Sequence, residues 1–197
     1  MILKQKIGSF RYVPHYAGNR ALPDAERMSF LLRPVTRLEL VAQAQWANAD
    51  ELTAWRGKAL AEHLKHEEYG ALIPQLPAQF QVGLRQFIEH VSMPQNVQME
   101  DEDGTTRTLT DPVEIYLEMA GEDWDVGMVK ADGGFASLEE AAEFGLIAEI
   151  QYVLNTSATL RGDERKNFLS LCAGSSQPTA TVAAPAPEAD APDKALT

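Results

Sequence analysis

Two histidines and a glutamate are the strongest metal-ligand candidates in the sequence. His63, His66 and Glu67 fall in a stretch predicted to be helical, and the i, i+3 spacing of the histidines could turn both imidazoles toward one ion. The zinc-protease arrangement H-E-x-x-H is absent, however, and the stretch carries further charged side chains, Glu62, Lys65 and Glu68. We therefore favour a solvent-exposed polar helix face, with a small metal-dependent hydrolase as the alternative.

The carboxylates of residues 100–103 raise the question of a calcium loop, because Ca²⁺ prefers oxygen ligands at alternate positions. An EF-hand loop needs glycine at its sixth position and glutamate at its twelfth. Counted from Asp101, Gly104 is fourth and Pro112 is twelfth. A charged hairpin tip is therefore the favoured interpretation.

Catalytic arrangements are weakly represented elsewhere in the chain. Cys172 would need a base and an oxyanion donor to act as a nucleophile, and it adjoins an Ala/Pro-rich end. Carboxylates flank Trp124, and a pair of carboxylates could perform acid/base work on a sugar, but an acidic loop with one anchoring aromatic is the simpler account. The sequence contains no Gly-rich phosphate loop, G-x-S-x-G elbow or dinucleotide fingerprint. These observations predict a protein that is not an enzyme and holds no cofactor or metal.

The composition limits the partners of the chain. Its 197 residues carry a formal net charge of -12, which would repel a phosphate backbone and disfavours nucleic-acid binding through a basic face. One cysteine excludes an intramolecular disulfide framework and favours a reducing compartment. No apolar run approaches the roughly 20 residues that span a bilayer. The apolar segment at the N-terminus is too short and too interrupted by polar residues for a secretory signal. We therefore expect a cytoplasmic protein that does not bind membranes.

Two short strands are predicted near the N-terminus. Phe10 and Tyr12 alternate with polar residues, and so do Met28, Phe30 and Leu32, which is the period-two pattern of half-buried strands. The intervening residues include two prolines, which lack a backbone donor, and a Gly-Asn pair that tolerates positive φ. The sequence thus predicts a small antiparallel strand pair joined by a turn-rich loop.

Helix caps and apolar periodicity predict a helical body. Thr36 and Glu39 have capping-box spacing, and so do Ser137 and Glu140. The predicted apolar stripes are Leu38, Val41 and Ala42 in the first helix; Leu52, Trp55 and Ala59 after a cap at Asn48; Phe80, Leu84, Phe87, Ile88 and Val91, ended by Pro94; and Leu138, Ala141, Ile147, Ile150, Val153 and Leu154 in the last helix.

A β-hairpin near residues 96–109 interrupts these helices. Asp103-Gly104 could form a tight primed turn, and threonines suit the return strand. Asp111-Pro112 then restarts a helix, with Glu114 as the reciprocal capping partner. The fold class predicted is α+β and predominantly helical, as one domain over residues 1–172. Residues 173–197 form an Ala/Pro-rich tail that we expect to be disordered.

Several segments, in order, resemble the tail assembly chaperones of long-tailed, siphovirus-like bacteriophages. Tyr12-Val13-Pro14, Gly18-Asn19-Arg20 and Leu22-Pro23 are similar to that family's first strand and loop. The middle region is similar to the family's helix, to its hairpin and to the start of its next helix, and the end is similar to its closing helix. The segments that carry this similarity are Phe87 to Val91, Asn96-Val97, Asp103-Gly104, Thr110-Asp111-Pro112, Leu146 to Ile150 and Lys166-Asn167. The loop of residues 118–134 is longer than in the family's pattern. The similarity covers roughly residues 10–168, and none of its motifs is chemically diagnostic.

The resemblance implies a non-enzymatic assembly factor of the host cell cytoplasm. Such a protein binds the phage tape measure protein, recruits major tail (tube) subunits around it and can form a homo-oligomer. Large aromatics dominate binding hot spots, so the candidate partner-binding residues are Trp46, Trp55, Phe80 and Trp124, although core packing is the more common role for such residues. The alternative function is a permanent virion structural protein, such as a capsid-decorating or tail-completion protein.

Overall fold

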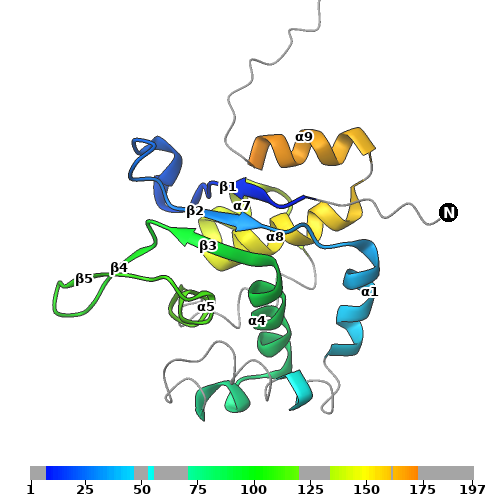
Figure 1. Cartoon of the computed structure of the whole chain (residues 1–197), viewed down its shortest axis with the longest axis horizontal. Coiled ribbons are helices and arrows are strands. Elements are labelled where there is room, and N and C mark those ends of the chain that lie inside the picture. Colours follow the sequence, from blue (N-terminus) through cyan, green and yellow to red (C-terminus); the bar gives the residue numbers. More distant parts are fainter. Residues whose placement is uncertain (1–7, 47–52, 56–70, 120–133, 161, 173–197) are drawn as a thin grey trace, which may run out of the picture.

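The computed structural model describes residues 8–46, 53–55, 71–119, 134–160 and 162–172. Within these ranges, helices surround a three-stranded sheet, and a separate two-stranded hairpin extends to one side (Figure 1). The predicted α+β, predominantly helical class is confirmed. Several predicted features lie outside the described residues. They are the histidine pair, Trp124, the 173–197 tail and, except for Thr53 to Trp55, the helix predicted after Asn48.

The three-stranded sheet has the order β1-β2-β3 and is antiparallel throughout. Strands β1 (Phe10–Tyr12) and β2 (Ser29–Leu32) confirm the predicted pair, with Tyr12 opposite Phe30. Strand β3 (Val91–Gln95) was not predicted. Helix α4 (Ala78–His90) ends before the expected stop at Pro94, because Val91 pairs with Leu32 and so satisfies the second edge of β2.

The loop between β1 and β2 is closed by side-chain hydrogen bonds. It contains the short helix η1 (Tyr16–Ala21), in which Ala17 and Gly18 have positive φ. Asn19 is buried; its Nδ2 donates to the carbonyls of Pro14 and Met28, both at 3.0 Å, and its Oδ1 accepts from the Met28 N–H at 2.6 Å. This one amide fixes both ends of the loop, which explains why an asparagine follows the glycine.

A buried glutamate joins this segment to helix α8 (Leu146–Thr159), which lies behind the sheet in Figure 1. The Glu149 carboxylate accepts hydrogen bonds from the Tyr12 hydroxyl, from the backbone N–H of His15 at 2.7 Å and from that of Tyr16 at 2.9 Å. Burial, followed by the charge of Glu149, holds the pKa of Tyr12 well above its ordinary value, so the phenol remains a donor.

Helix α1 (Arg37–Trp46) has the predicted capping box, and two residues of its predicted apolar stripe are exposed. The Thr36 N–H donates to Glu39 Oε2 at 2.8 Å, and the Glu39 N–H donates to Thr36 Oγ1 at 3.2 Å. Leu38 and Val41 face solvent, with exposed fractions of 80% and 64%, whereas Leu40 packs against the core. The predicted apolar stripe thus faces solvent at Leu38 and Val41, and Leu40 on the other side of the helix is the residue that packs against the core.

The hairpin of β4 (Gln98–Glu100) and β5 (Thr106–Thr108) confirms the prediction for residues 96–109. Its turn differs from the primed type, since Gly104 is the turn residue with positive φ and its N–H donates to the Asp101 carbonyl at 2.9 Å. Helix α5 (Pro112–Met119) begins at Asp111, whose carboxylate accepts from the Val113 N–H. Glu114 does not complete a capping box; it pairs with Arg107 at 2.7 Å instead.

Arg107 clamps the hairpin onto α5. Its guanidinium lies 2.9 Å from Asp101, 2.7 Å from Glu114 and 3.1 Å from Glu118. The hydrogen bond to Glu118, followed by the one to Asp101, raises the pKa of Arg107. The acidic run therefore has an internal cation among its partners, in keeping with a charged hairpin tip.

The predicted last helix is two helices. Ser137 is the N-cap of α7 (Leu138–Phe144), as predicted, and its Oγ accepts from the Glu140 N–H at 3.2 Å. Gly145, with φ 155° and ψ 165°, then ends this helix and separates it from α8. Helix α9 (Gly162–Cys172) was not predicted; it lies next to β1, where the Val13 N–H donates to the Cys172 carbonyl at 3.3 Å. The remaining short helix is η2 (Ile73–Gln75).

Gly83 marks the closest approach of α4 to its neighbours. A Cβ placed there would overlap with the Tyr116 hydroxyl of α5 and would lie only 2.6 Å from Gln151 Nε2 of α8. Both approaches are shorter than a normal van der Waals contact. Three helices therefore converge at this position because it has no side chain.

We predict that Tyr12→Phe lowers the free energy of unfolding by about 1.5–3 kcal/mol, because hydrogen bonds to charged groups contribute about that much. Urea unfolding followed by circular dichroism measures the change. Tyr16→Phe is the matched control, since Tyr16 reaches Glu149 through its backbone N–H. An unchanged unfolding midpoint for Tyr12→Phe would show that the phenol does not stabilise the carboxylate.

We also predict that Gly83→Ala destabilises the chain by about 1–3 kcal/mol through overpacking. An ordinary glycine-to-alanine change in a helix interior stabilises by up to about 1 kcal/mol, so the sign of the effect is diagnostic. Adding Tyr116→Phe removes the hydroxyl that the new methyl group would meet. Thermal unfolding should show part of the loss recovered in the double variant; a stabilised Gly83→Ala protein would refute the close approach.

Candidate functional site

The polar groups around Glu149 include residue types that catalyse reactions elsewhere, but their surroundings suppress that chemistry. Burial raises the pKa of the Cys172 thiol to about 12, so it stays protonated at neutral pH. Burial, reinforced by the charge of Arg20, lowers the pKa of His15. Arg20 itself donates to the carbonyls of Val13 at 2.8 Å and of Cys172 at 3.2 Å. The cluster thus joins the N-terminal segment to α8 and α9.

Neither a metal centre nor a membrane span is found in the described ranges. Among those residues, no group of three or more His, Cys, Asp or Glu side chains is placed to hold an ion. The helices of the same ranges include none that is long and apolar enough to cross a bilayer.

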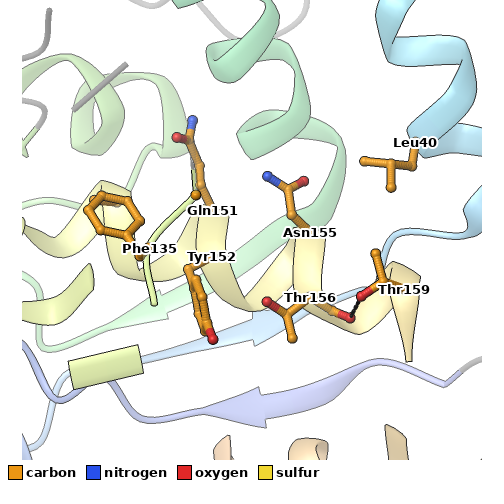
Figure 2. Close-up of a pocket in the computed structure, with 9 residues that line it drawn as sticks. Leu40, Phe135, Gln151, Tyr152, Asn155, Thr156 and Thr159 are labelled. Carbon is orange, nitrogen blue, oxygen red and sulfur yellow. Dashed lines mark hydrogen bonds between the residues drawn. The ribbon is translucent and has the colours of Figure 1, made fainter. Parts of the chain in front are cut away.

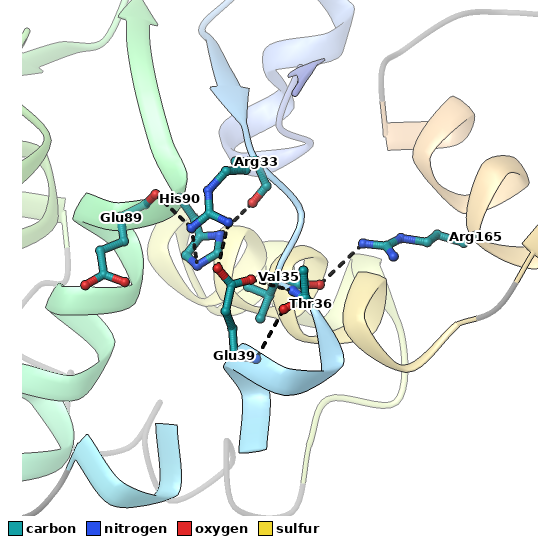
Figure 3. Close-up of polar contacts among 7 residues, drawn as sticks. All are labelled: Arg33, Val35, Thr36, Glu39, Glu89, His90 and Arg165. Atoms are coloured by element: carbon teal, nitrogen blue, oxygen red, sulfur yellow. Dashed lines mark hydrogen bonds and ion pairs between the residues drawn. The ribbon is translucent and has the colours of Figure 1, made fainter. Parts of the chain in front are cut away.

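A second polar cluster fixes the start of α1 (Figure 3). Arg33 Nη1 lies 2.7 Å from Glu39 Oε1, and the Arg33 N–H donates to the His90 carbonyl at 2.8 Å. Burial alone would raise the pKa of Glu39, but hydrogen bonds from Thr36 and Arg33 outweigh it and lower the pKa to about 2. On the other side, Arg165 of α9 donates to the Val35 carbonyl at 3.3 Å.

His90 is buried at the centre of this cluster as a neutral imidazole. Its Nδ1 lies 2.7 Å from the Arg33 carbonyl oxygen, which can only accept, so Nδ1 carries the proton. Its Nε2 lies 3.2 Å from Arg33 Nη2, which can only donate, so Nε2 accepts. Burial lowers the pKa of His90, in agreement with this neutral tautomer. The histidine connects the end of α4 to the chain that enters α1.

The anchored helix α1 presents an apolar outer face to solvent. Leu38 and Val41 are one helical turn apart, at i and i+3, so their side chains lie on the same face. Both are among the most exposed large apolar residues of the described chain. We call these two residues the α1 outer face. A pair of neighbouring exposed apolar side chains on a fixed helix is suited to contact an apolar partner.

A groove lies on the other side of α1 (Figure 2). Its volume is about 260 Å³. Leu40 and Phe135 lie at its two ends, and the helix α8 forms its floor. The lining residues are Leu40, Gly134, Phe135, Ala148, Gln151, Tyr152, Asn155, Thr156 and Thr159. The lining carries no charged side chain, so it favours an uncharged occupant.

The four aromatic residues expected to bind a partner have different positions. Trp55 and Phe80 belong to the hydrophobic core, with exposed fractions of 9% and 4%, and the Phe80 ring packs edge-on against Tyr116. The Trp46 and Trp124 side chains lie outside the described residues. The sequence pattern predicts Leu38 and Val41 on one apolar stripe but does not show that they are exposed, and it gives no sign of the groove, whose residues come from separate segments.

Comparisons with protein-family models, with curated proteins and with solved structures found no match to this chain.

We predict that the stability contributed by His90 falls as the pH drops below about 6.5. The pKa of His90 is lowered in the folded state, so the unfolded chain takes up the proton first, and acid shifts the equilibrium toward unfolding. The contribution is complete above the ordinary histidine pKa. His90→Asn keeps a donor for the Arg33 carbonyl and does not titrate.

Urea unfolding of both proteins between pH 7.5 and 5 measures this effect. As the pH falls, the free energy of unfolding of the natural chain should decrease more than that of His90→Asn. His15→Asn serves as the control for the other histidine with a lowered pKa. A difference that is constant over the whole pH range would contradict the neutral, buried His90.

Proposed function

We propose that this chain is a non-enzymatic assembly chaperone that binds an apolar segment of a partner protein. Its partner is then the tape measure protein of a long-tailed bacteriophage, around which it recruits major tail subunits in the host cytoplasm. The phage assignment rests on the resemblance of the sequence motifs. The partner-binding role rests on one observation, the exposed apolar pair Leu38 and Val41 on α1.

The physical case for binding is that these side chains gain by being covered. Fully burying a Leu or Val side chain contributes about 1.5–3 kcal/mol relative to leaving it exposed. Arg33, Glu39 and His90 hold the start of α1, so little order has to be gained when the outer face meets a partner. Leu38 and Val41 can therefore give a net contribution to affinity.

The charge of the chain supports the same role. A formal net charge of -12 keeps copies of the protein apart while part of their apolar surface is exposed. It also favours encounter with basic segments of a partner, and this contribution to the association rate decreases at high salt. Solubility and retained apolar exposure are what a chaperone must combine.

We predict that Leu38→Ser together with Val41→Ser weakens capture of the tape measure protein by roughly tenfold or more, as expected for the loss of interface anchors. The test is co-expression of that protein with the full chain, followed by pull-down at low salt. Because both positions are exposed, unfolding should change by no more than about 0.5 kcal/mol. Leu171→Ser is the matched control, since Leu171 is 68% exposed on α9, outside the α1 outer face.

Two results would contradict this proposal. One is failure of the natural chain to retain the tape measure protein at low salt. The other is equal retention by the natural chain and the double variant. Mass spectrometry of purified virions distinguishes the chaperone from the alternative function. Abundant copies in mature particles would identify a permanent structural protein.

A further inference from the structure

Helix α9 covers the outer edge of the sheet beside the Glu149 cluster (Figure 1). Strand β1 is an end strand, and the N–H of Val13, the residue after it, donates to the Cys172 carbonyl at 3.3 Å. The Cys172 side chain is fully buried. Burial is the main cause of the raised pKa of its thiol, and the charges of Arg20 and Glu149 also act on it, which places the thiol beside the cluster.

Few buried groups hold α9 in this position. Of its side chains from Glu164 to Cys172, that of Cys172 is the one that is buried, and Phe168 packs against the core while partly exposed. Arg20 donates to the carbonyls of Leu171 and Cys172, both at 3.2 Å, and the first of these bonds is exposed to solvent. Segments with few buried apolar contacts and exposed hydrogen bonds open at lower free energy than the whole fold.

The closed position of α9 also carries an electrostatic cost. Arg165 Nε is buried and has no hydrogen-bond partner, and Nη2 of the same guanidinium reaches only the Val35 carbonyl, at 3.3 Å. Burial lowers the pKa of Arg165, which shows that the charged form is poorly solvated. Opening of α9 would return this guanidinium to water and would hydrate the Glu149 carboxylate. The desolvation of two charges therefore opposes closure.

The rest of the fold has its own attachment to Glu149. The three donors to this carboxylate belong to Tyr12, His15 and Tyr16, and none comes from α9. The bonds that join β1 and η1 to α8 therefore remain when α9 leaves. The buried residues of α8 belong to the same core as those of α4 and α5, which lie on the other side of the sheet from α9 in Figure 1.

We propose that α9 is a strap that opens as a unit while β1, α8 and the remaining helices stay folded. Opening exposes the Cys172 thiol and frees the Val13 N–H at the outer edge of β1. An end strand with free main-chain groups can pair with another strand, so the closed strap protects this edge and the open strap makes it accessible. The inference is independent of the partner-binding role of α1.

The test uses the full chain, in which Cys172 is the single cysteine. Iodoacetamide alkylates an exposed thiol, so its reaction with Cys172, followed by mass spectrometry, reports opening. When reclosing is faster than labelling, the rate measures the equilibrium population of the open state. Well below the urea transition, labelling should be nearly independent of urea. It should be at least about tenfold faster than the globally unfolded population allows.

Two variants separate opening of the strap from global unfolding. Phe168→Ala removes packing of α9 and should accelerate labelling at least about fivefold. Ile115→Val is the matched control in the core of α5. It lowers global stability and would accelerate labelling about two- to tenfold if only global unfolding exposed the thiol. We expect no change in its labelling rate at low urea.

Two outcomes would overturn the inference. One is a labelling rate that depends on urea as steeply as global unfolding does, down to zero urea. The other is an acceleration in Ile115→Val by the same factor as its loss of global stability. Neither measurement involves a phage protein or the residues changed in the pull-down, so failure of the strap and failure of the chaperone proposal are distinguishable.

Discussion

The hydrogen bonds to the Glu149 carboxylate are the constraint on which the rest of this fold depends. A fully buried carboxylate carries a desolvation cost of several kcal/mol, which only well-placed donors can offset. Those donors are the Tyr12 hydroxyl and the backbone N–H groups of His15 and Tyr16. Because all of them come from the N-terminal segment, α8 can be buried only when β1 and the start of η1 are in place.

The position of α8 in turn defines the surfaces around it. Its buried residues Ile150, Val153 and Leu154 belong to the core, while Gln151, Tyr152 and Asn155 line the groove. Gly83 lets α4 approach closely enough for Gln86 to hold Asn155, and Tyr116 of α5 holds Gln151. The groove is thus formed by the same helix packing that closes the core.

Local signals were readable from the sequence, and long-range ones were not. The caps at Thr36, Asp111 and Ser137 depend on neighbouring residues, and each of these side chains accepts a backbone N–H at the start of its helix. The reciprocal bond predicted for Glu114 does not form, because this carboxylate pairs with Arg107. Strand β3 forms because β2 offers it an edge, which no pattern around Val91 reveals. The burial of Glu149 had one signal, since it falls at core-facing spacing between Leu146 and Val153. The groove combines residues of separate segments and had none.

The exposure of Leu38 follows from how α1 is held. The cluster of Arg33, Glu39 and His90 fixes the first turn of the helix, and Leu40 packs inward, so the remaining apolar residues of that turn must face solvent. A protein selected only for stability would gain from polar residues there, because exposed apolar pairs favour self-association. The anchored helix holds these two side chains in place, and a rigid surface loses little entropy on binding.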